Sequence, residues 1–544
     1  MSPPLGHVVA VAGAHVRVRL VDPEAQAPAA GAQIQSLVRI RTDHGLVFGL
    51  IRALHALPDP AKPGGEARGA ELDLVGERSI DPDGGLAGFQ HGVARFPALG
   101  DPVEPADATD LEAVYLPESE TRIHVGTLDR DGRLPACLMS DDLLGGHFAV
   151  LGTTGSGKSC AVAVLLRAML ADHPQGHVVL LDPHDEYGGA FGDRAVRLRP
   201  DGMSLPYWLL NFAEMVELFC SPERALRESE ADLLKRAVLA AKHAYAGEEG
   251  RPPITVDTPV PFRLSTVVET LDRAMGELDK PSDSLPYRRL KARIDTLRND
   301  RRFAFMFGTL AIQDTMADII AQLLRIPVDG KPITVVDLSA VPMDIVDAVV
   351  SVVARMIFDF AVWSEEATRL PILLVCEEAH RYIPANTEAG FGPTQRALAR
   401  IAKEGRKYGI GLGLVTQRPS ELSEAILSQC GTLLALRMSN EHDQAFVRRA
   451  LPEGADALFG ALPALSTGEA VVVGAGTAAP MRLRFHELPR DARPQSGSVS
   501  FADAWARDSG DRRRVDETVD RWRRQGSVAA ASTAGPTASL RKKR

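Results

Sequence analysis

A glycine-rich segment has the residue types and spacing of a phosphate-binding loop. In "AVLGTTGSGKSCAVAVLL", residues 149–166, the stretch 152–159 fits the pattern GxxxxGK(S/T). Such glycines allow a turn whose backbone N–H groups face phosphate oxygens at the start of the following helix. Lys158 is expected to reach the β- and γ-phosphates, and the Ser159 hydroxyl to bind Mg²⁺. The residues expected to contact the nucleotide are Gly152, Thr153, Thr154, Gly155, Ser156, Gly157, Lys158, Ser159, Cys160 and Asp182.

Two adjacent glutamates follow another apolar run, in "PILLVCEEAH" at residues 371–380. A phosphate-binding loop needs an acidic partner at the end of a second buried strand. We expect Glu377 to help hold the Mg²⁺ shell and Glu378 to polarise the attacking water as general base. The alternative is a solvated, charged helix start. The apolar run that leads straight into the pair favours the catalytic interpretation.

Other polar residues stand where further strands are expected to end. Gln417 follows "LGLVT" and could sense the γ-phosphate, although a strand has to end in something polar. Asp182 ends the run 177–182, which faces the nucleotide edge if the sheet is parallel. His184 could be read as a metal ligand, but without a second ligand at useful spacing a loop histidine is the interpretation we favour.

Basic residues recur at helical spacing after the paired glutamates. Steps of four, three and four put them on one helix face, where the alternative is a solvated stripe. They are Arg396, Arg400, Lys403 and Lys407. Arg406 stands near the expected end of that helix, from which it could reach a neighbouring subunit's γ-phosphate as an arginine finger. Arg437, at the end of the next strand, is the reserve candidate.

The elements that must position these residues alternate between apolar runs and helical patterns. Continuous apolar runs indicate strands buried on both faces, in a parallel sheet covered by helices. The runs are 147–152, 177–182, 333–338, 372–377, 409–415 and 432–437. Helical periodicity dominates between about 205 and 330, which predicts a helical insertion.

The two ends of the chain have different patterns. Residues 1–138 show short alternating strands and turns, which predict a small β-barrel or sandwich. Residues 491–544 are polar, with an expected helix followed by a disordered Ser- and Ala-rich tail. The terminal "RKKR" could bind nucleic acid or anionic lipid, though short basic ends are usually solvated.

Composition narrows the class of protein. The 544 residues are 45% hydrophobic, enough for two or three domains. Five scattered cysteines without a CxxC pair indicate a reducing compartment and no structural zinc. The longest apolar stretch, 347–363, contains Arg355 and Asp359, so we expect a buried helix, no membrane segment and a cytoplasmic protein. A net charge of −9 disfavours wrapping nucleic acid over the whole surface but permits a basic channel.

The order of motifs resembles the HerA family of hexameric DNA-translocating ATPases, related to FtsK-type pumps. The segments are "HFAVLGTTGSGKS", "LLDPHDEY", "LPYWLLN", "EEAHRYIP", "EGRKYGIGL" and "TQRPSEL", and the resemblance covers most of residues 1–490. It implies an α/β, RecA-like P-loop ATPase domain over 139–490 with its helical insertion at about 205–330. It also implies an N-terminal β-barrel over 1–138, of the kind shared with rotary ATP synthases, and a C-terminal brace within 491–544.

The resemblance further implies a homohexamer with ATP and Mg²⁺ at the subunit interfaces and duplex DNA through the centre. Lys158 and Ser159 match the phosphate and Mg²⁺ positions and Glu377 and Glu378 the acidic pair. Gln417 matches the sensor and Arg406 the trans arginine. Two positions depart from the family pattern. Gly146 stands where many relatives have a basic residue, and Asp185 replaces the glycine of "DPHGEY".

The leading hypothesis is an ATP-driven motor that moves duplex DNA through a ring and hands it to a nuclease or other effector, in DNA end processing or antiphage defence. The alternative is an ATPase ring that serves mainly as an assembly and regulatory platform for a defence effector enzyme. A membrane-anchored conjugation or division pump is a third reading, disfavoured because no membrane segment is found. Sixfold and sevenfold rings both remain possible.

Overall fold

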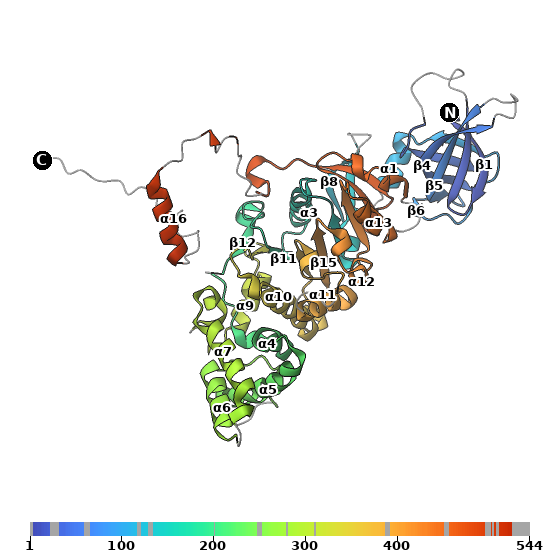
Figure 1. The fold of residues 1–544 in the computed structure, drawn as a ribbon. Coiled ribbons are helices and arrows are strands. Elements are labelled where there is room, and N and C mark those ends of the chain that lie inside the picture. Colours follow the sequence, from blue (N-terminus) through green and yellow to red (C-terminus); the bar gives the residue numbers. More distant parts are fainter. Residues whose placement is uncertain are drawn as a thin grey trace.

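A computed structural model of the chain describes most of its residues. The described ranges are 4–21, 32–58, 66–116, 121–128, 134–200, 202–246, 253–278, 281–308, 312–386, 392–450, 456–495, 502, 505–506 and 511–524. Two sheets organise them, a seven-stranded sheet near the N-terminus and an 11-stranded sheet further along the chain (Figure 1).

The N-terminal sheet closes into a barrel. Its strands follow the order β2-β1-β7-β3-β4-β5-β6, and β2 also pairs with β5, which joins the two sides. Alternate side chains such as Val16 and Val18 point inward and are fully buried, as a half-exposed strand requires. The expected barrel is therefore confirmed and the sandwich is not. The strands are β1 (Gly6–Ala12), β2 (His15–Leu20), β3 (Leu37–Thr42), β4 (Gly45–Pro58), β5 (Glu66–Ser79), β6 (Gln90–His91) and β7 (Pro102–Pro105).

A short helix, α1 (Ala108–Tyr115), leaves the barrel. Its capping box is formed by Asp107 and Asp110, and Arg39 of β3 donates to both carboxylates at 2.7 Å. Barrel side chains including Phe48 and Leu50 belong to the same buried cluster as the large sheet. The barrel is thus packed onto the second sheet by apolar contacts as well as by the chain connection.

The large sheet runs in the order β12-β13-β11-β14-β15-β10-β16-β17-β18-β8-β9. Neighbours from β12 to β16 are parallel, and every apolar run that predicted a strand lies in this part. The expected helix-covered parallel sheet is confirmed. Its strands are β10 (Phe148–Leu151), β11 (His177–Asp182), β12 (Ala195–Leu198), β13 (Ile333–Asp337), β14 (Ile372–Cys376), β15 (Ile410–Thr416) and β16 (Thr432–Leu436).

An antiparallel extension continues the sheet and was not predicted. It consists of β17 (Glu469–Gly474), β18 (Met481–Phe485), β8 (Arg122–Leu128) and β9 (Pro135–Met139). Strand β8 and all of β9 except its last residue lie before residue 139, yet both strands pair within the large sheet. Alternation in a short strand shows which face is buried but not which sheet it joins. The division of the chain at residue 138 itself stays a prediction.

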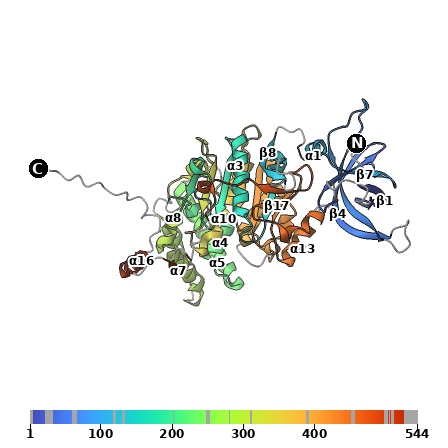
Figure 2. The same ribbon diagram turned by 90° about the horizontal axis from the view of Figure 1, so that it is seen from above.

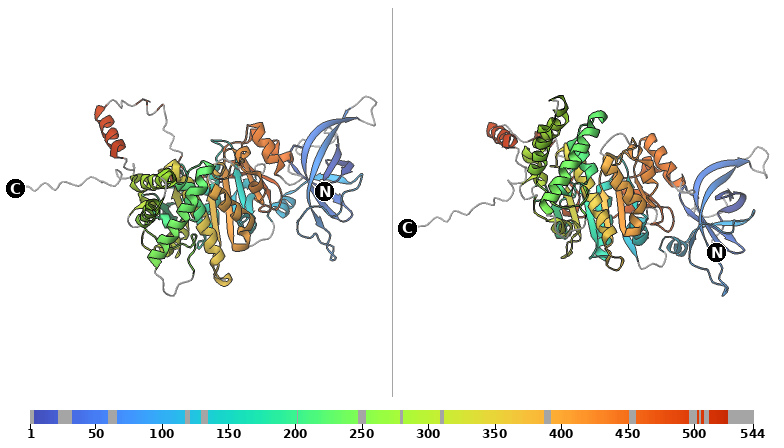
Figure 3. Two further views of the ribbon diagram at one scale, coloured as in Figure 1. Left: turned by 60° about the horizontal axis from the view of Figure 1, so that its bottom comes forward. Right: turned by 90° about the horizontal axis from the view of Figure 1, so that it is seen from below.

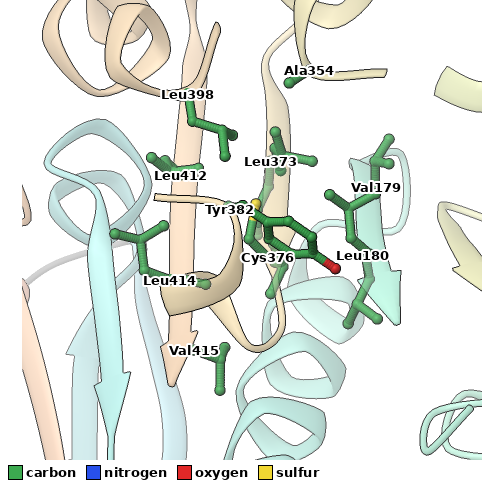
Figure 4. Close-up of a cluster of buried hydrophobic side chains, with 14 of the residues drawn as sticks. Val179, Leu180, Ala354, Leu373, Cys376, Tyr382, Leu398, Leu412, Leu414 and Val415 are labelled. Atoms are coloured by element: carbon green, nitrogen blue, oxygen red, sulfur yellow. The ribbon is translucent and has the colours of Figure 1, made fainter. Parts of the chain in front are cut away.

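Helices cover the parallel strands and bury them. Figure 4 shows side chains of three adjacent strands, among them Val179, Leu373 and Leu412, gathered with Leu398 of α11 and with Tyr382. The 21-residue α10 contributes a mostly buried face to this core, as expected for the stretch 347–363. The covering helices are α2 (Ser140–Gly145), α3 (Lys158–Asp172), α10 (Met343–Trp363), α11 (Gly392–Glu404), α12 (Glu424–Leu427), α13 (Glu441–Arg449) and α14 (Asp456–Phe459).

The described residues between 205 and 330 hold helices and no strand, which confirms the helical insertion. The insertion and the barrel lie towards opposite ends of the molecule (Figures 2 and 3). Its helices are α4 (Phe212–Phe219), α5 (Arg224–Ala246), α6 (Leu264–Gly276), α7 (Leu285–Asn299), α8 (Ala304–Phe307) and α9 (Met316–Leu324).

Near the C-terminus, α16 (Arg512–Arg524) occupies the segment expected to be helical, apart from the large sheet in Figure 1. The terminal "RKKR" lies outside the described residues. In the part of the chain that the structure describes, no helix combines the length and apolarity needed to cross a bilayer.

A buried ion pair ties the insertion to the sheet-covering helix α10. Glu214 of α4 is fully buried and accepts hydrogen bonds from Arg355 at 3.0 and 3.1 Å and from the Ser351 hydroxyl at 2.7 Å. The Arg355 guanidinium also contacts Asp359 and donates to the Leu209 carbonyl oxygen at 2.5 Å. Removing one partner of such a pair leaves a buried charge without compensation.

We therefore expect Glu214→Ala to lower the free energy of unfolding by about 3 kcal/mol. Thermal unfolding followed by tryptophan fluorescence measures the change as a lower Tm. Asp232→Asn, which removes the exposed partner of Arg236 on α5, is the control and should change stability by less than about 1 kcal/mol. An equal loss of stability in the two variants would contradict the conclusion that the Glu214–Arg355 ion pair holds α4 to α10.

Candidate active site

The glycine-rich loop connects β10 to α3 in the way its sequence predicts. Gly155 and Gly157 have φ angles of 75° and 99°, which glycine adopts without strain. A Cβ on Gly152 would come within 2.9 Å of the Cβ of Leu436. Helix α3 begins after Gly157 without a side-chain cap, so its first turn is open to an anion. The loop residues therefore fit a phosphate group.

Lys158 is buried in the loop, with 8% of its surface exposed. Its Nζ donates to the Thr153 carbonyl oxygen at 3.1 Å. Burial lowers the pKa of Lys158, while the nearby carboxylates of Glu377, Glu378 and Glu186 favour the charged form. The ammonium group thus stands among three carboxylates at the base of the loop.

Ser159 is the second residue of α3, and its hydroxyl donates to Glu186 Oε2 at 2.5 Å. A serine hydroxyl beside carboxylates is the donor set that Mg²⁺ takes from a protein when phosphates complete the shell. Cys160 follows in the same turn, and burial raises the pKa of its thiol. The first turn of α3 therefore presents the predicted Mg²⁺ ligand towards the acidic residues.

Glu377 immediately follows β14 and is almost completely buried. It accepts a hydrogen bond from the Tyr187 hydroxyl at 2.7 Å. Burial raises the pKa of Glu377 to about 8, and the neighbouring carboxylates of Glu186 and Glu378 act in the same direction. The Tyr187 hydrogen bond and Lys158 oppose that rise. A bound divalent cation would instead favour the charged carboxylate.

Glu378, the candidate general base, occupies the left-handed region with φ 53° and ψ 43°. Its side chain is buried between His184 and His380, with His184 Nε2 3.8 Å from Oε1 and His380 Nδ1 3.3 Å from Oε2. The structure therefore gives His184 a carboxylate neighbour beside the expected water position.

Asp182 lies at the end of β11 but does not face the open loop. Its carboxylate accepts the backbone N–H groups of His184, Glu186 and Tyr187 at 2.9 to 3.3 Å. Burial raises the pKa of Asp182 and these hydrogen bonds oppose the change. In the structure it shapes the loop after β11, and direct contact with nucleotide stays a prediction.

The departure at Asp185 has a physical explanation. Asp185 has a φ of 57°, in the region where glycine is unstrained and aspartate is among the more tolerated side chains. Its carboxylate pairs with Arg197, which also donates to Asp337 at 2.8 Å. The ion pair compensates for the backbone conformation that a glycine would adopt freely.

Gln417 immediately follows β15 and faces the loop. Its Oε1 accepts a hydrogen bond from the Thr154 hydroxyl. The backbone N–H of Gly152 donates to the Thr416 carbonyl oxygen at 3.3 Å, which joins the same strand end to the loop. The predicted sensor is thus in contact with the predicted phosphate loop.

Arg406 lies at the opposite edge of the sheet from the loop. It belongs to the turn Gly405–Tyr408 before β15 and borders a cavity of about 750 Å³ beside the first residues of β11, β14 and β15. The seven residues of β15 separate it from the loop by about 20 Å. Arg437 lies beside its own loop, where it donates to the Gly155 carbonyl oxygen at 3.4 Å. Of the two candidates, only Arg437 contacts the site of the same chain.

The basic side chains that share one face of α11 do not all carry a free, solvated charge. Arg396, Arg400 and Lys403 lie on α11. The Arg400 guanidinium lies 4.2 Å from the centre of the Phe358 ring and 3.8 Å from Glu404. Arg400 therefore takes part in packing α11 onto α10.

Gly146 is the last residue before the histidine that leads into β10. A Cβ at this position would lie 2.6 Å from the Asp142 carbonyl oxygen. His147 is buried, accepts the Leu412 N–H at 3.1 Å and lies 3.2 Å from the Ala402 carbonyl oxygen. A larger residue at 146 would require the end of α2 to shift.

Glu186 and Tyr187 were not predicted as site residues. Glu186 contacts Ser159, and Tyr187 contacts Glu377. Both lie in "DPHDEY", a segment that carried the resemblance, so their place in that motif was the available signal. Their contacts depend on how the loop after β11 folds back, which spacing alone does not show.

Glu377 makes stability depend on pH in nucleotide-free, Mg²⁺-free protein. The folded chain keeps its proton to about pH 8, whereas the unfolded chain releases it near about 4.3. The stability this group contributes is therefore present below the unfolded value and lost as pH rises through about 8. We expect Glu377→Gln to have a higher Tm than the unsubstituted chain at pH 8.5 and a similar Tm at pH 5. Thermal unfolding in EDTA measures the Tm at each pH, and Glu366→Gln, at an exposed position, is the control. If the Tm of Glu377→Gln and of the unsubstituted chain changed equally with pH, the proposed effect of burial on Glu377 would be contradicted.

Comparison with known proteins agrees with this geometry. Residues 123–357 match the family model for the central domain of helicase HerA. The DNA double-strand break repair helicase HerA of Pyrococcus furiosus is 27% identical over 441 residues, covering 74% of this chain and 75% of that protein. The HerA of Saccharolobus solfataricus is 29% identical over 385 residues, covering 70% of this chain and 71% of that protein.

Solved structures with similar chains include VirB4 of Thermoanaerobacter pseudethanolicus, at a TM-score of 0.49 and 18% identity, covering 69% of this chain and 98% of VirB4. The plasmid coupling protein TrwB with a non-hydrolysable ATP analogue has a TM-score of 0.48 and 16% identity, covering 73% of this chain and 96% of TrwB. The chain is thus similar to the HerA helicases over about three quarters of its length, and the phosphate-binding loop and its buried acidic partners lie within the similar region.

Proposed function

We propose that this chain is an ATP-driven translocase that acts on duplex DNA as a ring and passes it to a nuclease or other effector. The observation that best supports a ring is the distance between Arg406, the candidate trans arginine, and the phosphate-binding loop of the same chain. Arg406 lies at the amino edge of the sheet, while Lys158 and Glu378 lie at the carboxyl edge. Arg406 can therefore act at a γ-phosphate only if that nucleotide is bound by a second subunit, in a head-to-tail arrangement.

Within one subunit, each group has a distinct part in hydrolysis. The open first turn of α3 and Lys158 bind the phosphates. Ser159 and Glu377 would hold Mg²⁺, which would supply charge neutralisation at the phosphates. Glu378 polarises the attacking water, and Gln417 reports the γ-phosphate through Thr154. Arg406 of one subunit completes the site of the next by stabilising charge on the transferred group.

The relatives' names support duplex DNA as the substrate, since two of them are double-strand break repair helicases. A chain of net charge −9 can still bind DNA if a few basic side chains of each subunit face a central channel. Binding through phosphates would be independent of sequence and sensitive to salt.

Steady-state ATP hydrolysis tests the DNA assignment. We expect long linear duplex DNA to raise the rate severalfold, and the stimulation to fall between about 50 and 200 mM salt because phosphate contacts release counterions. Glu378→Gln provides the blank. A rate of ATP hydrolysis that does not change when DNA is added would contradict the translocase proposal. It would favour an ATPase ring that serves as a platform for an effector enzyme.

Mixing two inactive variants tests the trans arginine. Lys158→Ala and Arg406→Ala should each be inactive, but a one-to-one mixture should regain activity because about a quarter of its interfaces combine an intact loop with an intact arginine. A mixture of Lys158→Ala and Glu378→Gln is the control, since both changes fall on the same side of every interface. No recovery in the first mixture, with mixed rings confirmed by affinity tags, would exclude Arg406 as the trans residue.

A further inference from the structure

Glu378 is held in a position that leaves one of its oxygens without a hydrogen bond. Its side chain is only 9% exposed, and Oε2 has no hydrogen-bond partner among the described residues. Buried carboxylate oxygens are normally paired. His380 Nδ1 lies 3.3 Å from this oxygen. The unpaired oxygen therefore faces a nitrogen that could donate to it but does not.

His380 Nδ1 has a second neighbour, Thr416 Oγ1, at 2.9 Å. The same hydroxyl oxygen accepts the Arg418 backbone N–H at 3.0 Å. The Thr416 oxygen keeps a second lone pair, so its contact with Nδ1 can run in either direction. When the hydroxyl donates to Nδ1, Nδ1 is an acceptor and has no N–H to give to Glu378 Oε2.

The other arrangement of the same atoms has the opposite effect on Glu378. A neutral imidazole carries one N–H, on either nitrogen. Burial favours the neutral form by lowering the pKa of His380, although Glu378 opposes this change. If the proton moves from Nε2 to Nδ1, Nδ1–H can donate to Glu378 Oε2. Thr416 and Glu378 therefore compete for one nitrogen atom.

Thr416 is well placed to respond to nucleotide. It is the buried last residue of β15, and its carbonyl oxygen accepts the Gly152 N–H of the phosphate loop. The next residue, Gln417, accepts from Thr154 of the same loop. A change in the loop when phosphate binds or leaves thus acts on the strand end that carries the Thr416 hydroxyl.

We propose that His380 is a positioning residue that decides, through Thr416, whether the Glu378 carboxylate is free to orient the attacking water. While Thr416 donates to Nδ1, the carboxylate is free. When that donation is lost, Nδ1–H binds Oε2 and holds the carboxylate away from the water. The step changes only the tautomer of the imidazole, so no net proton is gained or lost. This inference rests on the proposed role of Glu378 as general base.

Thr416→Val removes the hydroxyl while keeping the side-chain shape. His380 Nδ1–H should then donate to the Glu378 carboxylate. We expect kcat for ATP to fall at least about tenfold, within the contribution of a general base, with KM within about twofold. Thr416→Ser should retain kcat because it keeps the hydroxyl. Thr334→Val, the same change in the buried strand β13, is the control for folding and should leave both constants unchanged.

The decisive comparison is the double variant. His380→Leu removes the competing nitrogen, so Thr416→Val/His380→Leu should recover kcat to within about threefold of the unsubstituted chain, and His380→Leu alone should stay in that range. A double variant as slow as Thr416→Val, or an inactive His380→Leu that still binds a fluorescent ATP analogue, would overturn the inference. The general-base assignment is tested separately: if Glu378→Gln hydrolyses ATP normally, that assignment fails, whereas an inactive Glu378→Gln beside a normal Thr416→Val contradicts only the role of His380.

Discussion

The site depends on one buried cation among carboxylates. Lys158 stands at the base of the phosphate loop with Glu377, Glu378 and Glu186 close enough to favour its charge. Isolated buried charges are unfavourable, so the lysine and its acidic neighbours need one another. Their meeting requires β10, β14 and β11 to end at the same edge of the sheet, which parallel pairing in the order β11-β14-β15-β10 provides.

Two hydrogen bonds within the chain occupy groups that a nucleotide would use. Lys158 donates to the Thr153 carbonyl oxygen, and Ser159 donates to Glu186. Both are local hydrogen bonds that phosphate oxygens and Mg²⁺ can replace with stronger, charge-assisted interactions. Nucleotide binding would then release Glu186 and favour the charged form of Glu377. Nucleotide binding is therefore expected to change the hydrogen bonds of Lys158 and Ser159.

The sequence predicted the local parts of this arrangement well. The glycine loop, Lys158, Ser159 and the pair Glu377–Glu378 each follow an apolar run, and parallel strands bring such run ends together. The antiparallel strands β17, β18, β8 and β9 escaped prediction because a short apolar or alternating segment does not specify the strand with which it pairs. The contacts of Glu186, Tyr187 and His380 escaped because they form between loops distant in sequence. Asp182 was placed at the correct edge, but its carboxylate turned out to bind its own loop.

A structure of the ring with Mg²⁺ and a non-hydrolysable ATP analogue tests the central claim most directly. The account predicts that Lys158 Nζ leaves the Thr153 carbonyl oxygen for the β- and γ-phosphates. It also predicts that Ser159 Oγ leaves Glu186 for Mg²⁺ and that Arg406 of the adjacent subunit approaches the γ-phosphate. Nucleotide bound elsewhere, or bound in this loop while Lys158 keeps its contact with Thr153, would contradict it.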